Sequence, residues 1–365
     1  MKIRCNREYL SSAWTTVNAV VPPKPIRPVL SQIKLCASKD NLELYATDMD
    51  MGVKYTVPEA IIEEKGEALI PASLMGGILK DAWGEEVQII SKKDSSDVIL
   101  PDSTFHILSD SVENYPGFPE FNGKNTFTLP GESFARMVEL TRFAISREDT
   151  RYALNGIFIE LKKGSVKMVS TDGRRLSCAD TKLPKGVKTT GSAIAPVPGL
   201  DEIIRCFSEE EENVEISLSE NMLQAKTKRA TVFTKLIEGT FPNYEEVIPK
   251  GYEKKVLFDS DALLLRLRQA ARLTSEESRA VKFSFKKGKL TMSSSSPEMG
   301  DATIEMAVKY EGEDIEIRFN PAYLVDVMRA LPGKEITLEL RESTKPGLIT
   351  CGKDFLYVAM PVNVD

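Results

Sequence analysis

Apolar and polar residues alternate along short stretches of the chain, and one arrangement of these stretches occurs three times. The first strand of each copy begins at one of three residues 124 positions apart, Ile33, Ile157 and Val281. A second strand passes through the residues eleven positions further on, Leu44, Met168 and Met292. Polar turns lie between the two strands, at 38–41, 162–165 and 286–289. Such alternation on both sides of a short polar turn predicts a β-hairpin at the same place in three blocks.

Each block also contains two segments with the spacing of an amphipathic helix. In 132–145, one helical face carries Phe134, Met137, Val138, Thr141 and Ile145. The second helix of each block begins beside a proline, at Pro71, Pro196 and Pro321. Proline suits this place because the N–H that it lacks would be unpaired there. The predicted helices are 7–20, 73–83, 134–147, 201–207, 262–272 and 321–331.

The order of elements in each block is strand, helix, strands, helix, strands. This order predicts an α+β fold of three repeated modules, each with two helices and antiparallel sheets. Polar segments that contain glycine separate the blocks at 121–125 and 249–255, so the expected domains are 1–123, 124–250 and 251–365. Modules of this kind close into a ring, alone or as a dimer, where their end-to-end contacts are complementary.

The composition is that of a globular protein with reduced thiols. Of the 365 residues, 42% are hydrophobic and 28% are charged. No apolar run is long enough to span a membrane, and the first ten residues lack the apolar core of a signal peptide. The cysteines are odd in number, far apart and never in a CxxC pair: Cys5, Cys36, Cys178, Cys206 and Cys351. This usage favours the cytoplasm and argues against a disulfide framework or a zinc site.

The sequence contains few of the residues and motifs that are typical of enzyme active sites. The single histidine, His106, lies in the alternating run "STFHILS", which predicts a strand residue without chemistry. One histidine excludes a multi-histidine metal site and disfavours a histidine-based triad. No P-loop and no GxGxxG that follows a strand is present. We therefore expect neither a metal nor a cofactor, and no catalysis.

The segment "VSTDGRRLS" (169–177) is the one stretch that suggests chemistry. Asp172 has the chemistry of a general base, and the guanidiniums of Arg174 and Arg175 that of a phosphate site, as in a hydrolase. The alternative is a tight turn between strands, in which Gly173 supplies a positive φ. The same Thr-Asp pair occurs at 47–48, one period earlier, and no convincing nucleophile accompanies Asp172. Both observations favour the turn.

Positive charge is concentrated in the predicted helices. The chain has a net charge of −6, whereas the predicted helices hold ten lysines or arginines and six acidic residues, a balance of +4. The remainder of the chain has a balance of −10 and includes the acidic run at 208–213. Ordinary solvated helix faces and a surface for a polyanion both explain this bias. If the polyanion is DNA, the contacts are to phosphates and independent of sequence, and encirclement would keep an acidic protein on it.

Several motifs together carry a family resemblance. They are "REDTRYALNGI" (147–157), "STDGRRL" (170–176), "LIEGTFPNYEEVIP" (236–249), "FNPAYLVDVM" (319–328) and "YVAMPV" (357–362). With these motifs in this order on a threefold repeat, the chain resembles the bacterial sliding clamps, the β subunits of DNA polymerase III, over its whole length. The resemblance implies a head-to-tail homodimer whose six similar domains form a ring around duplex DNA. It implies tethering of polymerases, and no catalysis.

The resemblance also implies three sets of site residues. A pocket for short linear peptides of partner proteins would comprise Arg151, Leu154, Thr171, Gly173, Arg174, Arg175, Leu176, Pro242, Val247, Pro346, Val358, Met360 and Val362. The residues facing DNA would be Lys24, Arg147, Tyr152 and Arg279, to which the charge count adds Arg136, Arg142, Arg266 and Arg268. The dimer contact would use Phe105, Ile107, Leu273, Glu298 and Asp301.

The implied partners are a clamp loader, the catalytic subunit of DNA polymerase III, and other polymerases or repair proteins. A general peptide-binding scaffold is the remaining alternative, and it would keep the pocket without the helix charge bias. The chain departs from the family pattern at Val197-Pro198, where relatives often have a basic pair, and at Glu246, where they often have arginine. It also ends in Asn363-Val364-Asp365 and not in a basic tail. These changes make DNA contact at 197–198 doubtful and the pocket rim more acidic.

Overall fold

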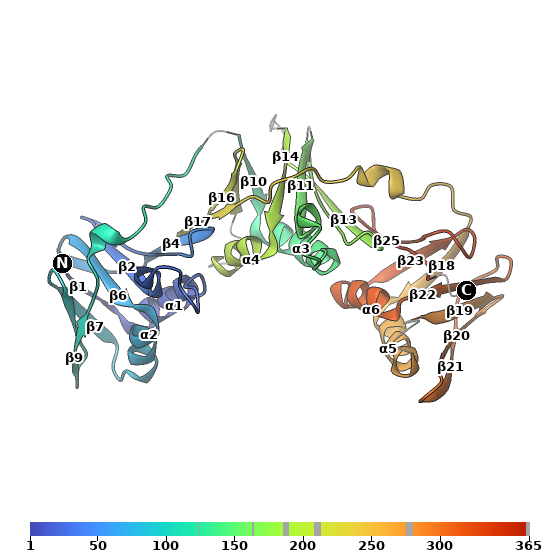
Figure 1. Ribbon diagram of the computed structural model, residues 1–365, viewed down its shortest axis with the longest axis horizontal. Coiled ribbons are helices and arrows are strands. Elements are labelled where there is room, and N and C mark those ends of the chain that lie inside the picture. The colour runs from blue at the N-terminus through green and yellow to red at the C-terminus, as the bar shows by residue number, and fades with distance from the viewer. Residues whose placement is uncertain (124, 163, 185–189, 208–212, 275–279, 363–365) are drawn as a thin grey trace. The chain divides into compact units, whose positions relative to one another are not determined.

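Two units, each with its own sheets, make up the chain in the computed structural model (Figure 1). The structure describes the chain except for residues 124, 163, 185–189, 208–212, 275–279 and 363–365. The first unit is Met1–Phe134 with Ala195–Leu236, and the second is Ala135–Ile194 with Ile237–Asp365. The predicted DNA contact Arg279, most of the acidic run and the last three residues of the tail lie outside the described residues.

All six predicted helices are confirmed, with ends that differ by a few residues. They are α1 (Arg7–Asn18), α2 (Ala72–Asp81), α3 (Gly131–Thr141), α4 (Val197–Arg205), α5 (Ser260–Ala270) and α6 (Pro321–Ala330). Asn6, Asp259 and Asn320 cap α1, α5 and α6, because each side chain accepts a hydrogen bond from a backbone N–H of the first turn. None of the helices in the described part of the chain is long and apolar enough to cross a membrane.

The prolines stand at the helix starts, although two of them are one residue further out than expected. Pro321 is the first residue of α6, whereas Pro71 and Pro196 are the N-cap residues of α2 and α4. The third helix begins earlier and ends earlier than predicted. After Thr141 the chain continues as a 3-10 turn, η3 (Arg142–Ala144), so Ile145 lies outside the helix.

The first unit contains two sheets. A five-stranded sheet has the order β5-β1-β7-β8-β9, and an eight-stranded sheet has the order β10-β15-β16-β17-β4-β3-β2-β6. The strands of the first sheet are β1 (Lys2–Asn6), β5 (Ile61–Glu64), β7 (Glu86–Ser91), β8 (Ser95–Ile99) and β9 (Thr104–Leu108). Those of the second are β2 (Gln32–Ala37), β3 (Leu42–Thr47), β4 (Met51–Val57), β6 (Gly66–Pro71), β10 (Thr126–Pro130), β15 (Asn213–Leu218), β16 (Met222–Lys226) and β17 (Ala230–Lys235).

The helices α1 and α2 pack together in this unit, and α1 also covers β3 and β4 (Figure 1). The buried face of α1 carries Leu10, Ala13, Trp14 and Val17, at the spacing of a single helical stripe. The indole N–H of Trp14 donates to the carbonyl of Ala72 over 2.9 Å, which joins the two helices.

The second unit repeats this plan. Its eight-stranded sheet has the order β14-β11-β12-β13-β25-β24-β23-β18, and its four-stranded sheet has the order β21-β20-β19-β22. The strands of the larger sheet are β11 (Gly156–Lys162), β12 (Ser165–Thr171), β13 (Arg175–Lys182), β14 (Gly191–Pro196), β18 (Lys254–Asp259), β23 (Glu335–Leu340), β24 (Gly347–Cys351) and β25 (Phe355–Ala359). Those of the smaller sheet are β19 (Val281–Lys286), β20 (Lys289–Ser296), β21 (Gly300–Ala307) and β22 (Ile315–Phe319).

The three predicted hairpins are the pairs β2–β3, β11–β12 and β19–β20. Each large sheet also joins strands of two different sequence repeats. In the first unit β17 pairs with β4, and Phe233 lies opposite Gly52. In the second unit β13 pairs with β25, and Leu176 lies opposite Val358. We call the β4–β17 pair the first junction and the β13–β25 pair the second junction.

Candidate functional site

A tight turn at Thr171–Arg175 leads from β12 into the second junction. The hydroxyl of Thr171 accepts from the N–H of Gly173 over 3.1 Å and donates to the carbonyl of Arg175 over 2.6 Å. Asp172 Oδ1 accepts from the N–H groups of Arg174 and Arg175 over 2.9 and 3.0 Å. Gly173 has φ +85°, a conformation that glycine adopts without steric cost. The turn that the sequence predicted is therefore confirmed.

The carboxylate of Asp172 is occupied as a structural acceptor. Besides the two backbone N–H groups, its Oδ2 accepts from Nε of Arg175 over 3.0 Å. A general base needs a lone pair directed at a substrate proton, and these bonds direct both oxygens of Asp172 inward. The arrangement supports a turn and not the hydrolase alternative.

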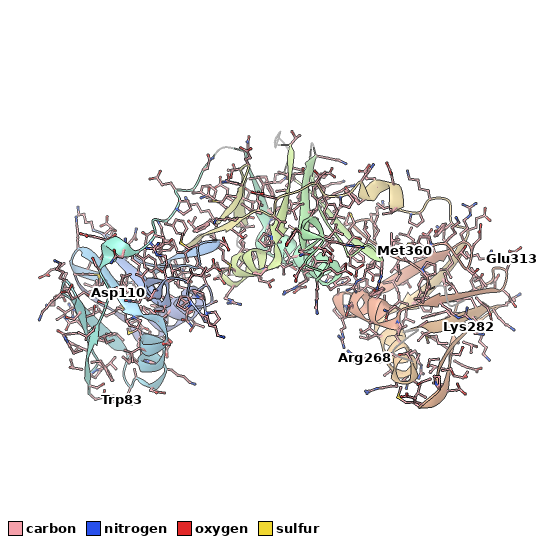
Figure 2. The ribbon with its side chains drawn as sticks, viewed as in Figure 1. Trp83, Asp110, Arg268, Lys282, Glu313 and Met360 are labelled. Atoms are coloured by element: carbon pink, nitrogen blue, oxygen red, sulfur yellow. The ribbon has the colours of Figure 1, made fainter. Side chains whose placement is uncertain are left out.

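Beside this turn lies a cavity of about 220 Å³. This is smaller than the roughly 300–1,000 Å³ of sites that enclose a whole small ligand, so it suits a few side chains of a peptide. Its walls are mainly apolar, and they are formed by Leu154, Thr171, Gly173, Arg174, Arg175, Leu176, Pro242, Asn243, Tyr244, Val247, Val358 and Met360. Val247 is 55% exposed and Met360, beyond the end of β25 in Figure 2, is 44% exposed, so apolar surface is open to solvent at the rim.

Aromatic packing fixes the wall that comes from the 3-10 helix η5 (Tyr244–Val247). The rings of Phe158 and Phe241 stack with centroids 4.7 Å apart. The hydroxyl of Tyr244 donates to Glu160 Oε2 over 2.7 Å, which ties η5 to β11. Burial and this carboxylate raise the pKa of Tyr244, so the phenol remains neutral. These contacts hold the η5 wall against β11.

Arg175 connects the turn to α6. Its guanidinium donates to Asp326 over 2.8 Å and to the carbonyl of Phe143 over 2.7 Å, and lies over the ring of Tyr323 at 4.6 Å. Burial lowers the pKa of this group, but nearby Tyr357 and the carboxylates of Asp326 and Asp172 outweigh burial and raise it. The Arg175 guanidinium is thus committed to the protein, although the residue lines the cavity.

Ten of the thirteen residues predicted for the pocket line this one cavity. Arg151 does not line it, but its Nη1 donates to the carbonyl of Asp172 over 3.3 Å and lies over Gly173. The carbonyl of Pro346 accepts from Tyr252, and the N–H of Val362 donates to Arg318. Asn243 and Tyr244 line the cavity without having been singled out. Both lie inside the motif 236–249, so this motif is the feature of the sequence that could have identified them.

A second hollow, of about 730 Å³, lies between α5 and α6. Its lining includes the three arginines Arg268, Arg272 and Arg329, and Figure 2 shows Arg268 on α5. Among the residues that the structure describes, none of these guanidiniums donates to a neighbouring side chain or carbonyl. The N-terminus of α6 also borders the hollow through Asn320 and Pro321. Uncommitted guanidiniums beside a helix N-terminus favour an anion such as a phosphate.

The other residues predicted to face DNA differ in their surroundings. Lys24, Arg142, Arg147 and Tyr152 are exposed, and Tyr152 is 68% exposed. Arg136 donates to the carbonyl of Ala330 over 2.7 Å, so part of its guanidinium caps the end of α6. Arg266 donates to Gln269 over 3.1 Å along α5. The sequence did not single out Arg272 and Arg329 for DNA, although both are in the charge count of the last two predicted helices.

The residues predicted for the dimer contact lie on and beside two strands at sheet edges. β9 ends the five-stranded sheet and β21 ends the four-stranded sheet. Phe105 is 38% exposed on β9, whereas Ile107 is 3% exposed and packs inside its own unit. Leu108, which the sequence analysis did not select, is 73% exposed. Leu273 is half-buried in the turn after α5, while Glu298 and Asp301 are exposed at the start of β21.

Comparisons with known proteins agree over the whole length. Models of the N-terminal, central and C-terminal domains of the DNA polymerase III beta subunit match residues 1–119, 128–243 and 245–363. The beta sliding clamp of Chlamydia pneumoniae is 31% identical over 100% of this chain and 99% of that protein. The beta sliding clamp of Pseudomonas putida is 31% identical over 100% of both. The crystal structure of a Pseudomonas aeruginosa sliding clamp bound to griselimycin is 29% identical, with a TM-score of 0.94 over 100% of both chains.

Proposed function

This chain belongs to the family of the DNA polymerase III beta subunit, the beta sliding clamps, and we propose that it encircles duplex DNA and tethers polymerases to it. It is a DNA sliding clamp, a processivity factor that catalyses no reaction. The observation that carries this conclusion is the match of three consecutive clamp domains to one chain, in order and without a missing domain. We also propose that residues 1–123, 124–250 and 251–365 are the three clamp domains of the chain, and that the protein is located in the cytoplasm.

The cavity beside the second junction is the site where partner proteins dock a short linear peptide. Its apolar walls and exposed rim suit a motif with apolar anchors, and Met360 adapts to anchors of different shape. The catalytic subunit of DNA polymerase III, other polymerases, repair proteins and the clamp loader are the proposed users of this site. One pocket shared by several partners makes their binding mutually exclusive on each protomer.

DNA is held by phosphate contacts from the exposed basic residues. The predicted contacts Lys24, Arg142, Arg147 and Arg268 are joined by Arg272 and Arg329 in the hollow between α5 and α6. Exposed lysine and arginine side chains suit phosphate contacts, which are independent of sequence and sensitive to salt. An anion-binding hollow favours the clamp over a peptide-binding scaffold that has no use for DNA.

Two protomers close the ring head to tail through β9 of one and β21 of the other. Both strands end their sheets, so each presents unpaired backbone groups to a partner strand. Phe105 and Leu108 supply apolar surface from β9, while Glu298 and Asp301 supply charge from the other end of the chain. Ile107 is buried, so its contribution to the contact is indirect, through the packing of β9.

Retention on closed DNA is the direct test. The protein is loaded by a bacterial clamp loader onto nicked circular DNA, isolated with it by gel filtration, and the circle is then cut with a restriction enzyme. We expect co-elution with the circle and release after linearisation, because only the free ends let a closed ring slide off. Protein that remains bound to the linear product through its free ends would exclude encirclement.

A further inference from the structure

Two residues at the peptide cavity differ in charge, Arg174 in its lining and Glu246 beside Asn243 on the wall from η5. We propose that the cavity selects peptides whose apolar anchor is flanked by a cation on one side and a carboxylate on the other. This inference rests on the proposed docking of partner peptides and adds the charge pattern that those peptides carry. It follows from the placement of Glu246 and Arg174.

The acidic side of the rim is formed by Glu246 on η5. Asn243 lines the cavity, and its side-chain Nδ2 donates to Glu246 Oε1 over 2.7 Å. Glu246 is not part of the cavity lining, but this hydrogen bond holds its carboxylate beside Asn243, which is. Glu246 is exposed and remains available to a peptide cation.

Its neighbour Glu245 is used differently. Glu245 accepts from Lys162 Nζ over 2.8 Å, and this hydrogen bond lowers the pKa of the carboxyl. Lys162 in turn contacts Glu160 over 3.0 Å, so the pair belongs to the outer side of η5 and β11. Two adjacent glutamates therefore have different partners, Glu245 an internal lysine and Glu246 a residue that lines the cavity. Substitution of Glu245 is therefore a matched control for substitution of Glu246.

The basic side of the rim is formed by Arg174. This residue lines the cavity and its side chain is exposed, while nearby Tyr323 and the carboxylates of Glu148 and Asp172 raise the pKa of the guanidinium. No carboxylate among the described residues forms an ion pair with Arg174, in contrast to Arg175, which is paired with Asp172 and Asp326. Arg151 does not add to this side, because Glu148 pairs with it over 3.3 Å.

The order of strands sets the distance between the two sides. η5 is tied to β11 through Tyr244, and Arg174 is tied to the end of β25, because the N–H of Met360 donates to its carbonyl. In the sheet, Arg174 directly precedes β13, and β12 separates β13 from β11. Two strand spacings amount to about 10 Å, the length of roughly three extended residues. With the reach of the two side chains added, we expect the peptide to carry its two charges three or four positions apart, with the apolar anchors between them.

Three fluorescein-labelled pentapeptides with the same leucine pair test this pattern on the full-length protein. Their sequences are KSLLD, the charge-swapped DSLLK and the neutral NSLLS, and affinity is measured by fluorescence anisotropy at low and high salt. The proteins are the unchanged chain, Glu246→Gln, Arg174→Gln and the control Glu245→Gln. Circular dichroism confirms that all four are folded.

We expect the two charged peptides to differ in affinity by about 5- to 30-fold, because one order makes two attractions and the other makes two repulsions. The difference should shrink at high salt, fall in Glu246→Gln and in Arg174→Gln, and persist in Glu245→Gln. Equal affinity of the charged peptides, or a difference that Glu245→Gln removes, would overturn the inference while leaving the pocket in place. Failure of all three peptides, the neutral one included, would overturn the pocket and this inference together.

Discussion

The turns at Thr47–Met51 and Thr171–Arg175 lie 124 residues apart and contain the same hydrogen bonds. In each, the threonine hydroxyl accepts from the N–H two residues later and donates to the carbonyl four residues later. In each, the aspartate accepts from the N–H groups two and three residues later. The Thr-Asp pair therefore turns the chain into a junction in the same way in both units.

The two junctions that follow these turns differ in which of the two paired strands carries the larger side chain. At the first junction β4 has Gly52, and the ring of Phe233 from β17 occupies the space that a side chain there would need. Phe118 packs edge-on against Phe233 with centroids 5.3 Å apart and covers it. At the second junction the position of Gly52 is taken by Leu176, and the facing strand has the smaller Val358. The two junctions thus differ in which of the paired strands carries the larger side chain, and at the second junction both residues line the cavity.

The largest expected effect comes from removing bulk at the second junction. Leu176→Ala combined with Met360→Ala should weaken peptide binding by about 2–4 kcal/mol, or about 30- to 1,000-fold, if both residues anchor the peptide. Isothermal titration calorimetry measures the loss, and light scattering should show that the dimer remains. Met49→Ala, at the exposed methionine of the first turn, is the control and should bind as before. Unchanged affinity of the double variant would refute the pocket.

A smaller effect is expected from adding bulk at the first junction. Gly52→Leu places at this junction the residue that the second junction has, and it must displace Phe233. Overpacking of this kind should lower the free energy of unfolding by about 1–3 kcal/mol, measured by urea denaturation. Gly77→Ala on α2 is the control, because a Cβ there meets nothing within 4 Å. If Gly52→Leu were tolerated as well as the control, the first junction would not be filled in the way described.

The smallest effect concerns the residue with positive φ in each turn. Met49 has φ 84° and Gly173 has φ +85°, so the two sites differ in side chain and not in backbone. Gly173→Ala should cost about 1–2 kcal/mol of unfolding free energy, because a Cβ is disfavoured in this conformation and would lie 2.7 Å from Arg151 Nη1. Met49→Gly should be neutral or stabilising by up to about 1 kcal/mol. Thermal unfolding of both variants, and of Gly173→Ala with Arg151→Ala, separates the backbone cost from the steric contact. Equal effects at 49 and 173 would contradict this account.

Local pattern was sufficient to predict much of the fold. The helices and hairpins depend on the spacing of apolar residues within ten to fifteen positions, and such spacing is visible in one sequence. The pocket residues Leu176 and Val358 came from the family resemblance, because nothing in the local pattern separates a pocket wall from a core residue. The structure then showed them paired across a junction.

Other features depend on partners far away in the sequence and were not predictable. In the sequence Arg136 counts as free positive charge, but in the structure its guanidinium donates to the carbonyl of Ala330 over 2.7 Å. Ile107 and Leu108 are adjacent apolar residues, and only the packing of β9 shows that the first is buried and the second exposed. Glu245 and Glu246 likewise cannot be told apart in the sequence, and only the position of Lys162 shows that Glu245 is the paired residue.

The pairing of strands across repeats also sets the order in which the protein is completed on the ribosome. Val53 and Val232 face each other in the first junction, 179 positions apart. At about 5–20 residues per second, the edge of β4 emerges roughly 10 to 40 seconds before β17 exists to cover it. A nascent chain therefore passes through a stage in which an open strand edge is presented to its neighbours on the same messenger RNA. Gly52 lies in that edge and adds no side chain to it, so the apolar ring that fills the first junction arrives only with the strand that closes the edge.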